Sequence, residues 1–61
     1  MNKYRVVLGV KGPEMLYSTE VEAETYTTAV AKAAVKLMGA FPSVLKGAEV
    51  VHKSTRMLRS W

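Results

Sequence analysis

The sequence contains no cysteine and no aspartate, and its only histidine is His52. Without cysteine there can be no disulfide framework, which is the usual stabilising device of small secreted domains. A single histidine without cysteine cannot supply the ligands of a zinc cluster, so we expect no metal site and no cofactor. The chain must therefore gain stability from good packing, from a partner or from self-association.

Groups that could carry out catalysis are equally scarce. His52 has no cysteine or aspartate to work with, and the serines and threonines do not form a nucleophile motif such as G-x-S-x-G. The segment from Gly9 to Gly12 resembles a phosphate loop only superficially, because it lies in a predicted hairpin with no helix N-terminus after it. We interpret His52 as a surface or edge-strand residue and expect a protein that is not an enzyme.

Long hydrophobic runs are also missing. The apolar stretch from Val6 to Val10 is too short for the core of a signal peptide or for a membrane span. The expected location is therefore the cytoplasm, with no membrane partner.

The chain has 61 residues, which is enough for one domain covering residues 1–61. Its net charge of +4 comes from nine lysines and arginines against five glutamates. The charges are distributed unevenly, because four of the glutamates lie between residues 14 and 24, whereas residues 53–61 contain three basic residues and no acid. One edge of the fold is thus expected to be acidic and the C-terminal end basic.

Two segments show the period-2 alternation of half-buried strands. Residues 3–11 place Tyr4, Val6, Leu8 and Val10 on one face, and residues 15–24 alternate in the same way. The pair Gly12-Pro13 marks a turn between them, which predicts a β-hairpin.

The register of this hairpin follows from matching the two faces. A four-residue loop over residues 12–15 keeps both apolar faces on one side, because it pairs Val6 with Val21. On the other face the same register pairs basic with acidic residues, namely Arg5 with Glu22 and Lys3 with Glu24.

A helix is predicted over residues 26–38, with Thr25 as N-cap and Gly39 as C-cap. The segment is rich in alanine and lacks glycine and proline, and Pro42 prevents continuation beyond it. At 100° per residue its apolar side consists of Tyr26, Val30, Ala33, Ala34, Leu37 and Phe41.

A third strand is predicted over residues 48–54, after a loop anchored by Val44 and Leu45. Residues 55–61 either extend this strand, form a helical turn or remain a flexible basic tail. A right-handed crossover places the third strand beside the first. The expected fold is α+β, of the type β-β-α-β: a three-stranded antiparallel sheet in the order 2-1-3, with the helix on one face and the other face open.

The most suggestive segment for binding is the C-terminal one. It combines Lys53, Arg56 and Arg59 with Trp61, and His52 directly precedes it. Basic residues interleaved with an aromatic suit phosphate contacts and base stacking, and they equally suit an anchor in a protein groove. The alternative is a frayed terminus whose tryptophan folds back on the core.

A second charged surface is expected on the hairpin, where three glutamates follow one another at every second position. They are Glu20, Glu22 and Glu24, and the basic residues facing them are Lys3 and Arg5. The glutamates could meet a hard cation or a basic partner, but we favour their neutralising Lys3 and Arg5 across the hairpin.

The stretch from Leu16 to Lys53 contains a strand ending in V21-E-A-E-T25, an alanine-rich helix and G47-A-E-V-V51 at the start of a last strand. This layout resembles the small phage-encoded inhibitors of host bacterial RNA polymerase, which have one helix packed on a three-stranded sheet. It is also similar to an archaeal ribosomal large-subunit protein of comparable size. The inhibitors use basic side chains of the last strand, but the matching positions here are His52 and Ser54, so no contact residue is transferred.

This resemblance implies a short modulator of viral origin that docks on a host machine in the host cytoplasm. Together with the charge pattern, it leads us to expect a non-enzymatic protein that modulates or inhibits a macromolecular machine, such as bacterial RNA polymerase, through its last strand and basic C-terminal segment. The alternative function is a nucleic-acid-binding module that uses lysine, arginine and Trp61, and a homodimer is left open.

Overall fold

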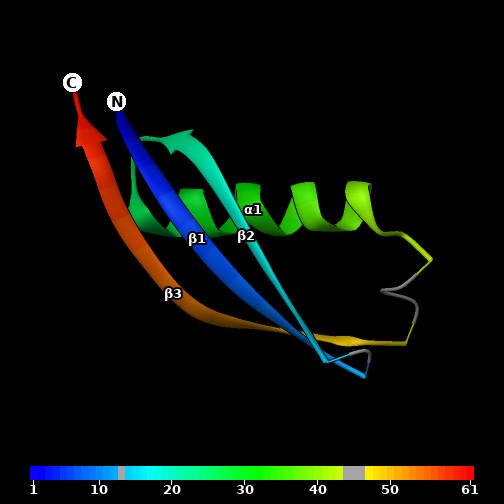
Figure 1. Ribbon diagram of the computed structural model, residues 1–61. Helices are drawn as coiled ribbons and strands as arrows, with labels where there is room; N and C mark the ends of the chain where they lie inside the picture. The colour runs from blue at the N-terminus through cyan, green and yellow to red at the C-terminus, as the bar shows by residue number, and fades with distance from the viewer. Residues whose placement is uncertain (13, 44–46) are drawn as a thin grey trace.

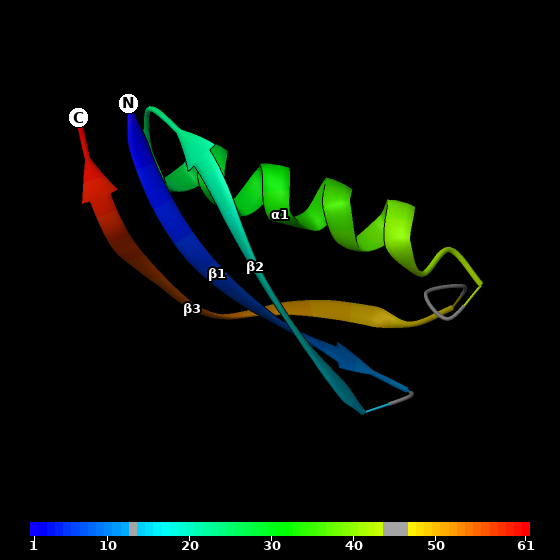
Figure 2. The ribbon, with the colours of Figure 1, turned by 45° about the horizontal axis from the view of Figure 1, so that its top comes forward.

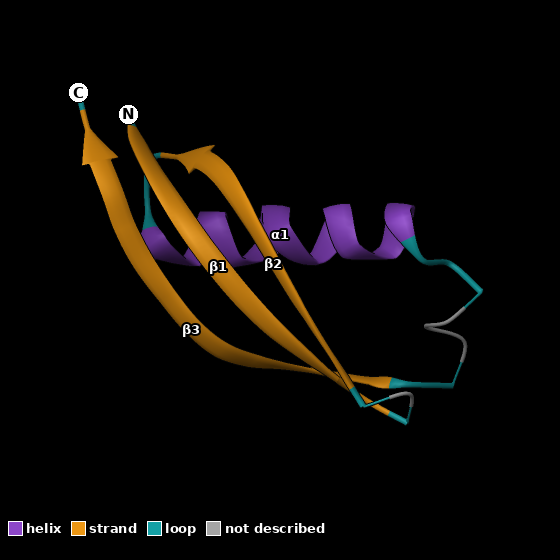
Figure 3. Ribbon diagram, in the orientation of Figure 1, coloured by secondary structure: helices purple, strands orange, loops and turns teal. Residues whose placement is uncertain are grey.

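The computed structural model describes residues 1–12, 14–43 and 47–61, so the expected anchors Val44 and Leu45 lie outside the described residues. The element order is β1 (Asn2–Lys11), β2 (Met15–Ala23), α1 (Tyr26–Ala40) and β3 (Glu49–Ser60) (Figure 1). The strands form one antiparallel sheet in the order β2-β1-β3. The α+β fold and its topology are therefore as predicted, with the helix as a second layer on the sheet (Figure 3).

The core lies between α1 and the two strands β1 and β2. The apolar face predicted for β1 is buried, and Val21 and Ala23 of β2 join it. The helix contributes Ala29, Ala33 and Leu37, all with no exposed surface. Small alanines allow the helix backbone to lie close to the sheet, which leaves the larger Leu37 to fill the remaining space.

The ends of the helix differ in how well the sequence predicts them. Thr25 is the N-cap, as expected, and its Oγ1 accepts a hydrogen bond from the Thr28 N–H at 3.2 Å. The prediction that Gly39 is the C-cap is wrong, because the helix continues through it and Phe41 ends it with an N–H bond to the Leu37 carbonyl. Pro42 supplies the stop, since a residue before proline is held away from the helical region.

The predicted hairpin register is wrong by two residues. Val6 faces Thr19 rather than Val21, Arg5 faces Glu20 and Lys3 faces Glu22. The last pair is Val10 with Met15, so the four-residue connection is 11–14 and begins one residue earlier than expected. A shift of two leaves every side chain on its predicted face, and both registers oppose basic to acidic residues. The choice therefore depends on the turn, where Gly12 and Glu14 adopt positive φ angles of 116° and 53°.

Strand β3 continues through residues 55–60, so of the three alternatives for this segment the strand extension is the one observed. Its pairing with β1 continues to the chain ends, where the Trp61 N–H donates to the Met1 carbonyl at 2.9 Å. The register shifts between Val7 and Leu8 and again between Lys3 and Tyr4, so Lys53 and Leu58 are extra residues on β3. The strand curves strongly along its length (Figure 2).

Candidate binding site on the open face of the sheet

The face of the sheet opposite α1, called the open face below, gathers the basic residues of two strands. Lys3 and Arg5 alternate with the buried residues of β1 and so point away from the helix. Cross-strand neighbours share a face, and β3 pairs Arg59 with Lys3 and Arg56 with Arg5. The basic residues of the hairpin and those of the C-terminal segment, which the sequence predicts as separate surfaces, therefore lie side by side on the sheet.

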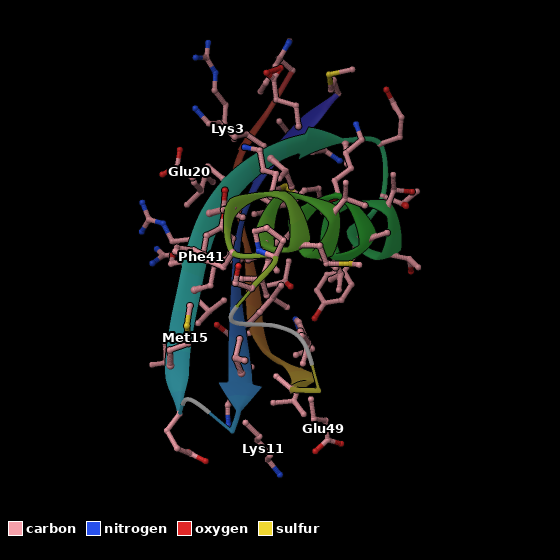
Figure 4. The ribbon with its side chains drawn as sticks, turned by 90° about the vertical axis from the view of Figure 1, so that its right-hand side faces the viewer. Lys3, Lys11, Met15, Glu20, Phe41 and Glu49 are labelled. Carbon is pink, nitrogen blue, oxygen red and sulfur yellow. The ribbon has the colours of Figure 1, made fainter. Side chains whose placement is uncertain are left out.

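The central feature of the open face is a set of like charges directly opposite each other. Lys3 faces Arg59 and Arg5 faces Arg56, and like charges in these positions destabilise a sheet. Glu20 compensates only the β1 side: its carboxylate lies 2.9 Å from Arg5 Nη2 and 3.3 Å from Lys3 Nζ. Lys3 and Glu20 lie beside each other in Figure 4. Over residues 1–12, 14–43 and 47–61, no ion pair involves a basic residue of β3.

Lys53 completes the row of basic residues because Gly9 leaves space for it. A Cβ at Gly9 would lie only 2.6 Å from Lys53 Cε and 3.2 Å from Val51 Cγ2. The absent side chain lets the methylene stem of Lys53 lie against β1 on the open face. The sequence shows a glycine within a strand, but the bulge that directs Lys53 onto it appears only in the structure.

Trp61 lies at the end of this row and remains 57% exposed, so it is not folded back on the core. The guanidinium carbon of Arg59 lies 5.4 Å from the centroid of its ring, which is a cation–π distance. The pair presents a flat aromatic surface beside a positive charge.

His52 is separated from the other residues of the predicted C-terminal site. It pairs with Leu8, so it belongs to the helix side of the sheet. Its ring packs edge-on against Tyr26 with centroids 5.9 Å apart, and its Nε2 lies 2.6 Å from Thr55 Oγ1. Its neighbours are therefore an aromatic ring and a hydroxyl rather than the basic row.

The glutamates of β2 are used differently from the prediction. We expected Glu22 and Glu24 to neutralise Arg5 and Lys3, but Glu20 binds both of them. These predicted ion pairs are wrong because the predicted register is wrong by two residues, and the actual register places Glu20 opposite Arg5. Glu24 lies beyond the end of β2, where its carbonyl accepts a bond from Asn2.

Hydrogen bonds from Arg5, and then from Lys3, hold the pKa of Glu20 below its ordinary value of 4.5. A carboxylate with a lowered pKa in the folded state stabilises the fold above its unfolded pKa, and this contribution is lost as the pH falls through the folded pKa. Glu20→Gln should therefore reduce stability at neutral pH, and the difference from the parent should disappear on acidification below about 4.5.

Urea unfolding at a series of pH values measures this difference. Glu24→Gln is the matched control, since Glu24 forms no ion pair with any described residue, and it should show no such pH dependence. An equal response of both variants would show that Glu20 has no special role.

Lysines of α1 cover the edge of β2, which the sequence does not indicate directly. Lys32 Nζ donates to the Glu22 carbonyl at 2.7 Å, and Lys36 Nζ donates to the Glu20 carbonyl at 3.1 Å. A hollow of about 660 Å³ lies beside them, with Val21, Ala31 and Val35 among its lining residues. Because the ammonium groups are already bonded to backbone carbonyls, the lysines act first as a cover for this strand edge.

Within the described part of the chain, no three His, Cys, Asp or Glu side chains come close enough to hold a metal ion. Nor is any described helix long and apolar enough to cross a membrane. Comparison with known proteins finds no matching family model, no similar curated protein and no similar solved structure.

Proposed function

We propose that the protein is a small non-enzymatic binding protein that docks its open face on an acidic surface of a larger macromolecular machine and thereby modulates or inhibits it. Its partner-binding residues are Lys53, Arg56, Arg59 and Trp61, joined on the same face by Lys3 and Arg5. The resemblance to phage-encoded inhibitors of RNA polymerase suggests that such a machine is a bacterial RNA polymerase.

The observation that supports this proposal is the pairing of like charges between β1 and β3. A sheet selected for stability alone would place opposite charges across a strand pair, as it does for Arg5 and Glu20. Here Lys3 faces Arg59 and Arg5 faces Arg56, so the repulsion is retained at a cost to folding. An acidic partner removes this repulsion on binding, which makes the arrangement favourable in the complex.

A second candidate function is binding of single-stranded nucleic acid, and the contact of Arg59 with Trp61 favours it specifically. Phosphates would follow the basic row, while a base stacks on the exposed indole ring at its end. No other tryptophan is present in the sequence, so fluorescence reports on this position alone.

The test captures partners from a bacterial lysate treated with nuclease, using the immobilised protein. We expect a stoichiometric protein partner with an acidic surface that is released by moderate salt, because screening weakens exposed charge contacts. In parallel, Trp61 fluorescence is titrated with a mixed-sequence oligonucleotide and with poly-glutamate. Failure to recover a protein partner would contradict the docking proposal, and quenching by the oligonucleotide alone would replace it with the second candidate.

A further inference from the structure

Strand β3 contributes no buried side chain, although it is twelve residues long. Helix α1 packs mainly over β2 and β1, and it leaves the β3 part of that face largely uncovered. On this side Val50 is 39% exposed and Met57 is 53% exposed. A strand held mainly by its backbone ladder with β1 presents an apolar strip that another chain could cover.

The two edges of the sheet differ in whether they can accept another strand. At β2, an added strand would have to displace Lys32 and Lys36 from the carbonyls of Glu22 and Glu20. At β3, no side chain of the described residues bonds to the backbone of the strand, so its outward N–H and C=O groups are free to pair. An added strand is therefore expected to pair at the β3 edge rather than at the β2 edge.

We propose that two copies of the chain associate edge to edge through β3, in antiparallel orientation, to form one continuous six-stranded sheet. A two-fold axis perpendicular to the sheet keeps both helices on one face and both basic rows on the other. The occupant of the β3 edge is therefore a second copy of this chain.

The bulge at Lys53 decides the register of this pairing. Leu8 pairs with His52 and Val7 with Ser54, so the alternation of β3 reverses across Lys53. When β3 pairs antiparallel with β3 of a second copy, side chains on the same face lie opposite each other only if the two paired residue numbers add up to an odd value. A two-fold axis between Lys53 and Ser54 satisfies this condition.

This register brings compatible apolar side chains together on the helix side. On the helix side Val50 of one copy lies opposite Met57 of the other, so two apolar contacts form about the axis. Of the two neighbouring odd registers, the one with the higher sum would place Lys53 directly opposite Arg56 of the second copy, and repulsion disfavours it. The one with the lower sum would set His52, on the helix side, opposite Lys53, on the open face, so the faces would not match at the bulge.

Charge complementarity supports the antiparallel direction. Glu49 begins β3 and is its only acid, whereas Arg56 and Arg59 lie near its end. Glu49 pairs with Lys11 of β1, and both residues lie at the hairpin end of the sheet (Figure 4). No ion pair of the described residues includes Glu49. In the proposed register its diagonal neighbour on the open face is Arg56 of the second copy, within reach of long side chains.

A charge swap tests the inference without any ligand, so its outcome is separate from that of the proposed function. Sedimentation velocity should show a dimer for the parent and monomers for Glu49→Arg and for Arg56→Glu, because each variant opposes like charges twice. An equimolar mixture of the two variants should form a heterodimer, since both pairs become attractive. Recovery of the dimer also shows that both variants fold. Glu14→Arg, which makes the same charge change in the hairpin loop, should remain dimeric.

Cysteine cross-linking tests the register, because the natural chain has no cysteine. Under mild oxidation, a mixture of Val50→Cys and Met57→Cys chains should give a covalent heterodimer, and neither variant alone should do so efficiently. A monomeric parent, a charge-swap mixture that remains monomeric, or no preference for the mixed cross-link would overturn the inference.

Discussion

Leu37→Ala should leave the protein largely unfolded at room temperature. Leu37 is the largest side chain that α1 buries, and it has no exposed surface. Truncating a buried leucine costs about 2–5 kcal/mol, because it removes apolar contacts and leaves a cavity. The core of a domain this small supplies only about 3–5 kcal/mol, so the loss is comparable with the whole stability. Circular dichroism during urea and thermal unfolding measures the effect.

The control is the same substitution at Leu16, which is 69% exposed on the open face of β2. Surface substitutions usually change stability by no more than about 0.5 kcal/mol, so Leu16→Ala should unfold almost as the parent does. Similar losses in both variants would mean that α1 is not packed on the sheet as described.

Lys53→Glu should weaken binding of the acidic partner by roughly ten- to hundredfold. A hydrogen bond to a charged group contributes about 1.5–3 kcal/mol, and each 1.4 kcal/mol is about tenfold in affinity. Lys53 lies against Gly9 on the open face, so the reversed charge would face the ligand. The slope of log affinity against log salt for an oligonucleotide should also decrease by about one. Trp61 fluorescence titrations at several salt concentrations provide both quantities.

Lys32→Glu makes the same change to the net charge but places it on α1, away from the open face. If location matters, this control should retain its affinity to within about threefold, which corresponds to less than 1 kcal/mol. Equal weakening by the two variants would mean that only the total charge attracts the ligand, and the open face would then not be the binding site.

On β1 and β2 the predicted buried faces are confirmed but the predicted residue pairs are wrong, and the hairpin shows why. Alternation assigns Val6 and Val21 to the same side in any register that differs by two residues. Charge matching could not decide between the registers either, because Glu20, Glu22 and Glu24 are equivalent along the strand. The positive φ angles of Gly12 and Glu14 select the actual turn, and these depend on backbone geometry that local composition does not specify.

The sequence predicts which basic residues belong to the candidate site but not how they are arranged on the sheet. Basic residues are evident at both ends of the chain, yet their meeting depends on the β1–β3 pairing and on two bulges. One bulge turns Lys53 toward Gly9, while its neighbour His52 faces Tyr26 on the other side of the sheet. No periodic pattern predicts such an extra residue, because a bulge interrupts the periodicity itself.

The sequence by itself determined the order of the elements, the buried faces of β1 and β2, the N-cap at Thr25 and the split between acidic and basic segments. These features depend on local spacing and on the chemistry of neighbouring residues. The helix face was predicted only in part, because Ala33 and Leu37 are buried as expected but Tyr26 and Phe41 are exposed and Ala29 takes their place in the core. Only the tertiary structure decided which charges face each other, that Lys32 and Lys36 cover one strand edge, and that β3 is left with an open one. The physical reason is that cross-strand contacts join residues far apart in the chain, and a shift of one or two positions changes every partner while the local pattern stays the same.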